Sequence, residues 1–301
     1  MQRMTAPAVV ATKGERKVTM LTAYDYAAAR LADAAGVDML LVGDSLAMVV
    51  LGLDDTLSVT MDEMLHHVRA VSRGASRALV VADMPFMSYQ VSVAEAVANA
   101  GRFLKEGRAG AVKLEGGREV APQVKAMVEA GIPVIGHVGL TPQHVAAMGG
   151  FKVQSKTAEA AAALVEDAKI LAKAGCFAVV LECIPAPVAA VVTEVLPVPT
   201  IGIGAGPDCD GQVLVFHDVL GLYDRMHPKF VKQYANLGKL AQEALTQYVD
   251  EVTRNVFPGP EHVFAMNQEA LAHFRSLIAE DGTPADDRGE RPSPANISQR
   301  A

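Results

Sequence analysis

The chain has 301 residues, of which half are hydrophobic, and its 27 basic and 34 acidic residues give a net charge of −7. This balance lacks the basic face of a general nucleic-acid binder, and no apolar run approaches the roughly 20 residues that cross a bilayer. The first residues lack the pattern of a secretory signal, and three cysteines without a CxxC motif exclude a disulfide framework and indicate a reducing compartment. We therefore expect a cytoplasmic α/β enzyme with no nucleic-acid or membrane partner.

Eight short apolar runs are predicted to be strands of a parallel sheet. They are apolar throughout, which is typical of strands buried on both faces. In chain order they are Val18–Thr22, Met39–Val42, Leu79–Ala82, Ala111–Leu114, Pro133–Gly136, Ala178–Leu181, Pro199–Ile203 and Val213–Phe216.

Helical patterns lie between most of these runs. Thr60 with Glu63, and Ser92 with Glu95, have the spacing of capping boxes at helix starts. The predicted helices are Tyr26–Ala35, Met61–Ser72, Val93–Glu106, Val120–Ala130, Thr157–Ala174, Pro187–Val195 and Lys232–Thr253.

The alternation of eight strands with helices predicts a (β/α)₈ TIM barrel, whose usual length of roughly 250 residues matches residues 18–266. Only about ten residues separate the last two strands, which is too few for a full crossover helix. Either that helix is a single turn or the strand count is off by one. The alternative architecture is an open doubly wound sheet.

The two ends of the chain differ from the barrel in character. Residues 1–17 are predicted to contain a short helix that closes the bottom of the barrel. Residues 267–301 are a C-terminal extension that starts with a predicted helix at Gln268–Ala279. The stretch Asp281–Ala301 has almost no large apolar residues, so we expect it to be disordered.

Polar residues follow the predicted strands at the end where barrel enzymes place their active sites. Three carboxylates, Asp44, Asp83 and Glu115, follow strands two, three and four. Oxygen ligands of this kind suit a hard divalent cation such as Mg²⁺, which usually takes one or two carboxylates and keeps other positions for water or substrate. The alternative is that these acids cap helices and pair with Lys113.

Lys113 lies two residues before Glu115, so both side chains point to the same face of the fourth strand. It could form a Schiff base, bind a substrate carboxylate or keto oxygen, or make a salt bridge inside the barrel. Nearby carboxylates keep a lysine protonated, which disfavours the nucleophilic role.

Glu182 ends the sixth strand and is a candidate general base, although the same position would suit a helix cap. His137 ends the fifth strand and is a candidate proton donor or hydrogen-bonding group, with a structural role as the alternative. Cys183 lacks the partners of a cysteine nucleophile and is interpreted as inert.

The segment GIGAG after the seventh strand is not a dinucleotide fingerprint, because the third spaced glycine is missing. It is either a phosphate-binding loop, as often found after strands seven and eight of barrels, or a tight turn with close backbone approach.

Long segments of the chain resemble the ketopantoate hydroxymethyltransferase family. They occur in the family's order and cover most of residues 18–266. These segments are TAYDY (22–26), LLVGDSLAMVVLG (40–52), ADMPFMSY (82–89), AVKLEGG (111–117), GHVGLTPQ (136–143), VVLECIP (179–185), GIGAGPDCDGQVLVFHD (202–218) and FPGPEHVF (257–264).

The resemblance implies a barrel of the phosphoenolpyruvate/pyruvate type. It implies transfer of a hydroxymethyl group from 5,10-methylenetetrahydrofolate to 3-methyl-2-oxobutanoate, on the way to pantothenate, in a homodecamer. The residues that match the family's Mg²⁺ ligands are Asp44, Asp83 and Glu115. The residues that match its ketoacid-binding set are Asp44, Ser45, Asp83 and Lys113. Glu182 matches its proton acceptor, and His137 is expected to assist the hydrogen-bond network around the substrate.

Two alternatives stay open at this point. One is a lyase or mutase that acts on carbon–carbon or carbon–phosphorus bonds and uses the same type of barrel. The other is a non-catalytic binding protein that has kept the fold, against which the complete set of acids argues.

Overall fold

Eight parallel strands form a closed barrel in a computed structural model that describes residues 3–225 and 228–280. Each strand pairs with the next along the chain, and β8 closes onto β1. The predicted (β/α)₈ barrel is confirmed, and the open doubly wound sheet is excluded. The strands are β1 (Val18–Thr22), β2 (Met39–Val42), β3 (Leu79–Asp83), β4 (Ala111–Glu115), β5 (Val134–Gly139), β6 (Ala178–Glu182), β7 (Thr200–Ile203) and β8 (Gly211–Leu214).

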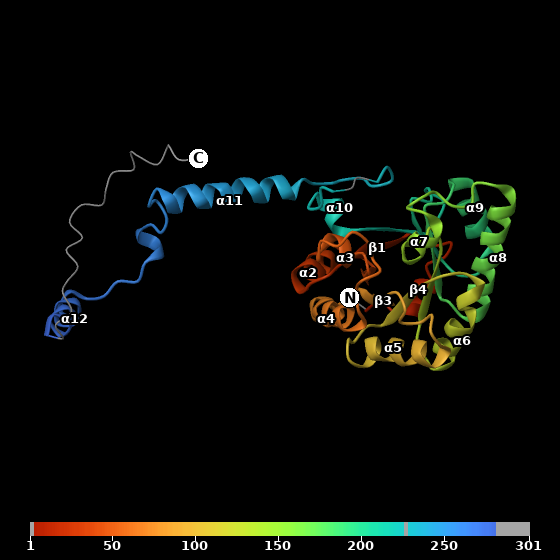
Figure 1. The fold of residues 1–301 in the computed structure, drawn as a ribbon, viewed down its shortest axis with the longest axis horizontal. Helices are drawn as coiled ribbons and strands as arrows, with labels where there is room; N and C mark the ends of the chain where they lie inside the picture. Colours follow the sequence, from red (N-terminus) through yellow and green to blue (C-terminus); the bar gives the residue numbers. More distant parts are fainter. Residues whose placement is uncertain (1–2, 226–227, 281–301) are drawn as a thin grey trace. The chain divides into compact units, whose positions relative to one another are not determined.

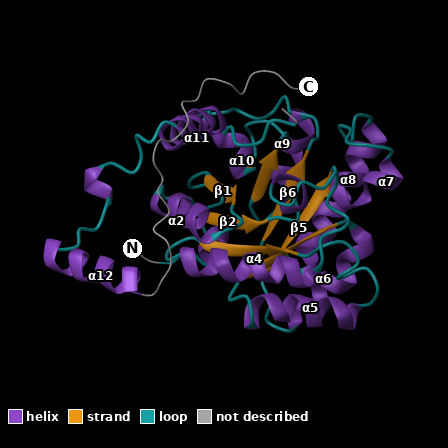
Figure 2. Cartoon of the chain, turned by 60° about the vertical axis from the view of Figure 1, so that its left-hand side comes forward, coloured by secondary structure: helices purple, strands orange, loops and turns teal. Residues whose placement is uncertain are grey.

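A ring of helices surrounds these strands (Figure 1, Figure 2). Thr60 and Glu63 form the predicted capping box of α4, whereas Ser92 accepts the Glu95 N–H at the start of α5, which is half of the second predicted box. One long helix follows each of the first six strands: α2 (Tyr26–Ala34), α4 (Met61–Gly74), α5 (Val93–Lys105), α6 (Ala121–Glu129), α8 (Ala158–Ala174) and α9 (Ala186–Val195).

The connection between β7 and β8 explains the short spacing seen in the sequence. Residues 204–210 form turns rather than a helix, so the count of eight strands was right and a crossover helix is not needed here. Strand β8 begins two residues earlier than predicted, at Gly211. It also ends two residues earlier, at Leu214, so His217 and Asp218, which directly follow the predicted run, lie in the short helix α10 (Phe216–Leu220) and not at a strand end.

Short helices occupy the loops at the mouth of the barrel and its N-terminal end. Helix α1 (Ala6–Val10) places Ala6 and Val9 in the same buried cluster as the interior side chains of the strands. The mouth loops contain α3 (Leu46–Val49), α7 (Val145–Met148) and the 3-10 turns η1 (Arg118–Val120) and η2 (Pro142–His144).

Two apolar layers build the core. One fills the space between the strands and the surrounding helices and includes Phe103, Met127 and Leu171. The other fills the barrel interior and includes Met39 and Ile135. Burial of such side chains, at about 25 cal/mol per Å² of apolar surface, is the main stabilising contribution to the fold.

Polar residues occupy the top of the barrel interior because alternate residues of a strand face the same side. The inward row on β3 runs from Leu79 through Val81 and therefore continues to a side chain at the strand end. The residues that end the inward rows of β3 to β6 are Asp83, Lys113, Glu115, His137 and Glu182. Strands that are apolar along most of their length thus place charged side chains at the carboxyl end of the barrel.

The chain divides into two compact units, Met1–Leu240 and Ala241–Ala301. Helix α11 (Leu237–Thr253) crosses this boundary, and the second unit also contains η3 (Pro260–His262) and α12 (Gln268–Glu280). The expected division into segments 1–17, 18–266 and 267–301 stays a prediction. The expected disorder of Asp281–Ala301 concerns residues outside the described part. Among the described helices, none has the length and apolar character needed to traverse a bilayer.

The carboxylate of Asp33 on α2 accepts hydrogen bonds from the residues that precede β3. Partial burial acts to raise its pKa, but hydrogen bonds from the Ser76 hydroxyl and from the N–H groups of Ala78, Arg77 and Ser76 lower it to about 2. This contribution to stability is present above the ordinary pKa of 3.8 and is lost as pH falls towards 2.

We therefore expect Asp33→Asn to lower the urea midpoint at neutral pH, with a difference from wild type that shrinks as pH falls from about 4 to about 2. Urea unfolding over this pH range, with exposed Asp54→Asn as the control, is the measurement. A difference that does not change with pH would contradict the role given to the Asp33 carboxylate.

Candidate active site

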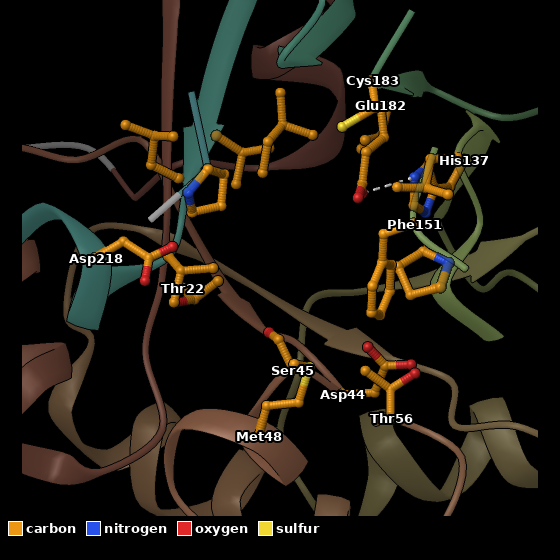
Figure 3. Close-up of a pocket in the computed structure, with 18 of the residues that line it drawn as sticks. Thr22, Asp44, Ser45, Met48, Thr56, His137, Phe151, Glu182, Cys183 and Asp218 are labelled. Atoms are coloured by element: carbon orange, nitrogen blue, oxygen red, sulfur yellow. Dashed lines mark ion pairs between the residues drawn. The ribbon is translucent and has the colours of Figure 1, made fainter. Parts of the chain in front are cut away.

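A cavity of about 440 Å³ opens at the carboxyl end of the barrel. Figure 3 shows Asp44 and Ser45 facing the same cavity as Glu182 and His137. The structure brings all the predicted site residues together in its lining: Asp44, Ser45, Asp83, Lys113, Glu115, His137 and Glu182. Side chains from separate strand ends converge here because the closed barrel carries every strand end to one rim.

Lys113 is the central cation of the inner cavity. Its Nζ lies 2.8 Å from Asp83 Oδ1, and both side chains are buried. Burial acts to lower the pKa of Lys113, but the carboxylates of Asp83, Glu115 and Asp44 outweigh it and raise the pKa above its ordinary value. The ammonium therefore stays charged, which suits binding of an anionic substrate and not attack on a carbonyl carbon.

Carboxylates crowd the same region. Burial, followed by repulsion from Asp83 and Glu115, raises the pKa of Asp44 well above its ordinary value. Burial also raises the pKa of Asp83, although Lys113 opposes this. For Glu115, contacts with His137 and Lys113 outweigh burial and lower the pKa. Asp44 and Asp83 thus lie in a site that holds more negative charge than its own cations balance.

These carboxylates do not form a ready-made ligand cluster. Within residues 3–225 and 228–280, no three His, Cys, Asp or Glu side chains are spaced to surround a metal ion. Lys113 pairs with Asp83, and the side-chain amide of Gln143 donates to Asp44 Oδ2 at 2.8 Å.

His137 connects the carboxylates of the inner cavity. Its Nε2 lies 3.2 Å from Glu182 Oε2, and its Nδ1 lies 3.5 Å from Glu115 Oε1 and 3.3 Å from Lys113 Nζ. Burial and the Lys113 charge act to lower the pKa of His137, but Glu115 and Glu182 outweigh them and raise it to about 9. The imidazolium therefore holds Glu182 at the edge of the cavity (Figure 3).

Ser45 follows β2 and is oriented by a buried tyrosine. The hydroxyls of Ser45 and Tyr24 lie 2.9 Å apart, and Tyr24 is almost fully buried. Burial raises the pKa of Tyr24, so its hydroxyl stays protonated. The pair fixes Ser45 as a neutral hydrogen-bonding group beside the carboxylate of Asp44.

Sequence reasoning missed Gln143 and Tyr89. Both are buried, and both belong to segments quoted for the family resemblance, but neither stands at a strand end. The available signal was a glutamine beside a proline in the loop after β5, which predicts a turn rather than a site.

The outer part of the cavity differs in chemistry from the inner part. Figure 3 shows Phe151 and Met48 beside the inner polar residues. We use the term outer part for these two residues together with the following members of the lining: Val49, Lys152, Val153, Tyr223, Pro228, Lys229 and Phe230. Sequence reasoning did not find this wall, because its residues come from loops far apart in the chain.

The GIGAG segment forms a tight turn with close packing. Gly204 and Gly206 adopt positive φ angles of 63° and 85°. A Cβ atom at Gly204 would collide with the ring of Phe230, and one at Gly206 with the side chain of Ala186. Close approach of other parts of the chain therefore explains both glycines.

Cys183 follows Glu182 at the rim of the cavity. Burial, and then the neighbouring Glu182 charge, raise the pKa of its thiol to about 12. The thiol stays protonated, which is unsuited to a nucleophile and agrees with the inert role expected from the sequence.

Comparison with known proteins identifies the family. The model of the ketopantoate hydroxymethyltransferase family matches residues 3–260. The 3-methyl-2-oxobutanoate hydroxymethyltransferase of Syntrophobacter fumaroxidans is 72% identical over 264 residues, which cover 88% of this chain and 94% of that protein. The enzyme of the same name from Enterococcus faecalis is 59% identical over 255 residues, 85% of this chain and 93% of that protein. The chain belongs to the ketopantoate hydroxymethyltransferase family. Its activity is hydroxymethyl transfer to 3-methyl-2-oxobutanoate, which forms ketopantoate in pantothenate biosynthesis.

Solved structures confirm the type of barrel. A phosphonopyruvate hydrolase in complex with oxalate and Mg²⁺ matches with a TM-score of 0.56 at 15% identity, over 93% of this chain and 99% of that one. A 2,3-dimethylmalate lyase of the PEP mutase/isocitrate lyase superfamily matches with a TM-score of 0.55 at 17% identity, over 94% of this chain and all of that one. These likenesses concern the fold alone, so the lyase and mutase alternatives receive no support from them.

Proposed function

We propose that the family's reaction takes place in this cavity, with the ketoacid bound in its inner part and 5,10-methylenetetrahydrofolate as the one-carbon donor. The observation that carries the proposal is the placement of buried, charged Lys113 and of Glu182 in the lining of one cavity. A cation that binds the acid end of a ketoacid and a carboxylate that takes a proton from its carbon chain are the two groups that this reaction needs.

The ketoacid is bound by the groups around Lys113. The ammonium attracts the substrate carboxylate and keto oxygen, and the Ser45 hydroxyl adds a hydrogen bond at the same end of the substrate. Asp83 keeps the ammonium in place through their 2.8 Å contact. Asp44 completes this set, and His137 orients Glu182 through the contact with its Oε2.

Mg²⁺ fits the chemistry of the donors, with Asp44, Asp83 and Glu115 as the residues that would hold it. Their oxygen atoms are the preferred ligands, and the excess of buried negative charge favours a cation. One or two protein carboxylates suffice for this ion, so the lack of a three-residue cluster is compatible with it. When bound, the ion polarises the α-keto carbonyl.

The bond changes follow from the position of the base. Glu182 removes the proton from C3 of the ketoacid, and the resulting enolate carries the electron pair of the broken C–H bond. Its C3 then attacks the methylene carbon of the folate iminium, so that a carbon–carbon bond forms and the iminium electron pair moves to nitrogen. Water supplies the hydroxyl oxygen to the transferred carbon as its carbon–nitrogen bond breaks, and tetrahydrofolate leaves with that electron pair and a proton from the water. Lys113 and Ser45 stabilise the developing charge on the ketoacid oxygens.

The outer part of the cavity is the proposed place of the folate ring system. Its aromatic and apolar side chains suit a flat ring, and its two lysines, Lys152 and Lys229, suit an acidic tail. Phe151 lies beside the inner polar residues and so borders the place where the two substrates must meet (Figure 3).

Phe151→Ala is expected to raise the KM for methylenetetrahydrofolate about 5-fold, because a ring contact of roughly 1 kcal/mol is lost. Exchange of the C3 proton of the ketoacid with D₂O should stay at the wild-type rate, since it needs only the inner part of the cavity. Tyr234→Ala, an exposed tyrosine outside the cavity lining, is the matched control. An unchanged folate KM would place the folate ring elsewhere.

The assay that tests the proposed function supplies 3-methyl-2-oxobutanoate and methylenetetrahydrofolate, with and without EDTA. We expect ketopantoate with Mg²⁺ and its loss after chelation. Failure to form ketopantoate at saturating Mg²⁺ would overturn the proposal, and full activity in EDTA would overturn the metal requirement alone.

A homodecamer in the cytoplasm completes the proposal. The family resemblance supports the assembly, and exposed apolar residues of α11 support burial against another subunit: Leu240, Leu245, Tyr248, Val249 and Val252. Sedimentation equilibrium should give ten times the mass of one chain, and a monomeric mass would contradict the assembly. The three cysteines, all free, agree with a reducing compartment.

A further inference from the structure

Gln143 was not predicted as a site residue, yet it donates hydrogen bonds to the carboxylates of two predicted metal ligands, Asp44 and Glu115. It lies in η2, in the loop after β5, and is 2% exposed. We infer that Gln143 is a positioning residue that holds the carboxylate of Asp44 in the orientation needed to bind the ketoacid and its metal ion. The inference rests on the proposed function of the cavity.

The chemistry of its partners fixes the orientation of the Gln143 amide. One terminal atom lies 2.8 Å from Asp44 Oδ2 and 2.9 Å from the main-chain oxygen of Met84. A carbonyl oxygen can only accept, and a carboxylate also accepts, so this terminal atom must be the NH₂ group. Both of its hydrogens are then used, one of them on Asp44.

The other end of the amide is held from the opposite side. Gln143 Oε1 accepts from the Tyr89 hydroxyl at 2.7 Å and from the Gln90 amide at 3.3 Å. Tyr89 is fully buried, and its hydroxyl also accepts from the Glu115 N–H at 3.2 Å. The amide therefore uses its whole hydrogen-bonding capacity and has no freedom to turn away from Asp44.

The main chain of Gln143 hydrogen-bonds to a second carboxylate. Its N–H donates to Glu115 Oε2 at 3.0 Å. One residue thus connects the ends of β2, β3 and β4 to the loop after β5. Because this second bond belongs to the main chain, a side-chain substitution should release Asp44 and leave the bond to Glu115 in place.

The test uses two variants that differ in what they present to Asp44. Gln143→Leu removes the donor and keeps much of the volume, whereas Gln143→Glu keeps the shape and places a second carboxylate against Asp44. Each is expected to weaken binding of 3-methyl-2-oxobutanoate, measured by calorimetry without the folate, by about 10- to 100-fold. Binding of Mn²⁺ alone, followed by electron paramagnetic resonance, should weaken in Gln143→Leu, while the folate KM of both variants changes less than the ketoacid KM.

Gln123→Leu is the matched control. Its amide donates to the main-chain oxygen of Tyr89 at 3.4 Å and contacts no carboxylate of the site, so both binding constants should equal those of wild type. A double-mutant cycle of Tyr89→Phe with Gln143→Leu should be non-additive for ketoacid binding, since the Tyr89 hydroxyl contacts the Gln143 oxygen as well as the main chain of Glu115. Tyr89→Phe alone, which preserves packing, should weaken ketoacid binding even if Gln143→Leu fails to fold.

Wild-type affinities for both probes in folded Gln143 variants, in a protein that forms ketopantoate, would overturn the inference and leave the proposed function intact. A loss of thermal stability in Gln143→Leu with unchanged affinities would reduce Gln143 to a structural role and would also overturn it. A wild-type protein that binds neither probe would overturn the inference together with the proposed function.

Discussion

Glu182→Gln is expected to reduce ketopantoate formation by about 10²- to 10⁴-fold, the usual contribution of a general base. Glutamine keeps the size of the side chain and its contact with His137 but cannot accept the C3 proton. The rate of C3–H exchange into D₂O, followed by NMR without folate, should fall by the same factor. The dissociation constant of the ketoacid should change little, because Lys113 and Ser45 bind its other end.

Glu194→Gln is the control, since it makes the same change at an exposed position of α9, the helix that follows β6. Exchange that continues in Glu182→Gln at the wild-type rate would show that another group is the base. Loss of both exchange and ketoacid binding would instead assign Glu182 to substrate binding.

Lys113→Met is expected to abolish activity and to lower the free energy of unfolding by about 3–5 kcal/mol, the usual cost of leaving a buried charge without its partner. The variant keeps the length and apolar stem of the side chain but removes the ammonium next to Asp83. Buried carboxylates at Asp83, Glu115 and Asp44 then face one another with less compensation. Urea unfolding and the ketopantoate assay measure the two effects.

Lys173→Met, at an exposed position of α8, controls for the loss of a lysine. The double variant Lys113→Met/Asp83→Asn should regain part of the lost stability, because it removes both members of the ion pair. A Lys113→Met protein as stable as wild type would contradict the electrostatic role. Borohydride trapping of wild type with the ketoacid should yield no covalent adduct, and an adduct on Lys113 would restore the Schiff-base alternative.

Much of the barrel could be predicted from local patterns. Strands β1 and β2 have the predicted bounds, because their apolar runs are interrupted on both sides by residues that favour turns or helices. Strands β5 and β6 extend beyond the predicted ends to include His137 and Glu182. The apolar run is shorter than the strand, because the polar site residues at its end still pair with the neighbouring strands.

The β7–β8 connection was ambiguous for a different reason. Its length excluded a full helix, but length alone does not distinguish a single turn from a miscounted strand. The closure of β8 onto β1 resolves this, because Val18 and Gly211 pair in register. Such a pairing joins residues from the two ends of the barrel and leaves no trace in a local pattern.

The sequence by itself determined the class of the fold, the family and the acids and lysine at the strand ends. The fold class depends on periodicity, and the acids and lysine on the residue types at strand ends, which a local pattern records. The family depends on the resemblance of long segments of the chain. Only the tertiary structure decided which side chains pair in the site. Lys113 pairs with Asp83, His137 pairs with Glu182, and the Gln143 amide donates to Asp44. The physical reason is that hydrogen bonds and buried charges act over a few ångströms, whereas Gln143 and Asp44, for example, are 99 positions apart, and only the closed barrel brings such residues within reach.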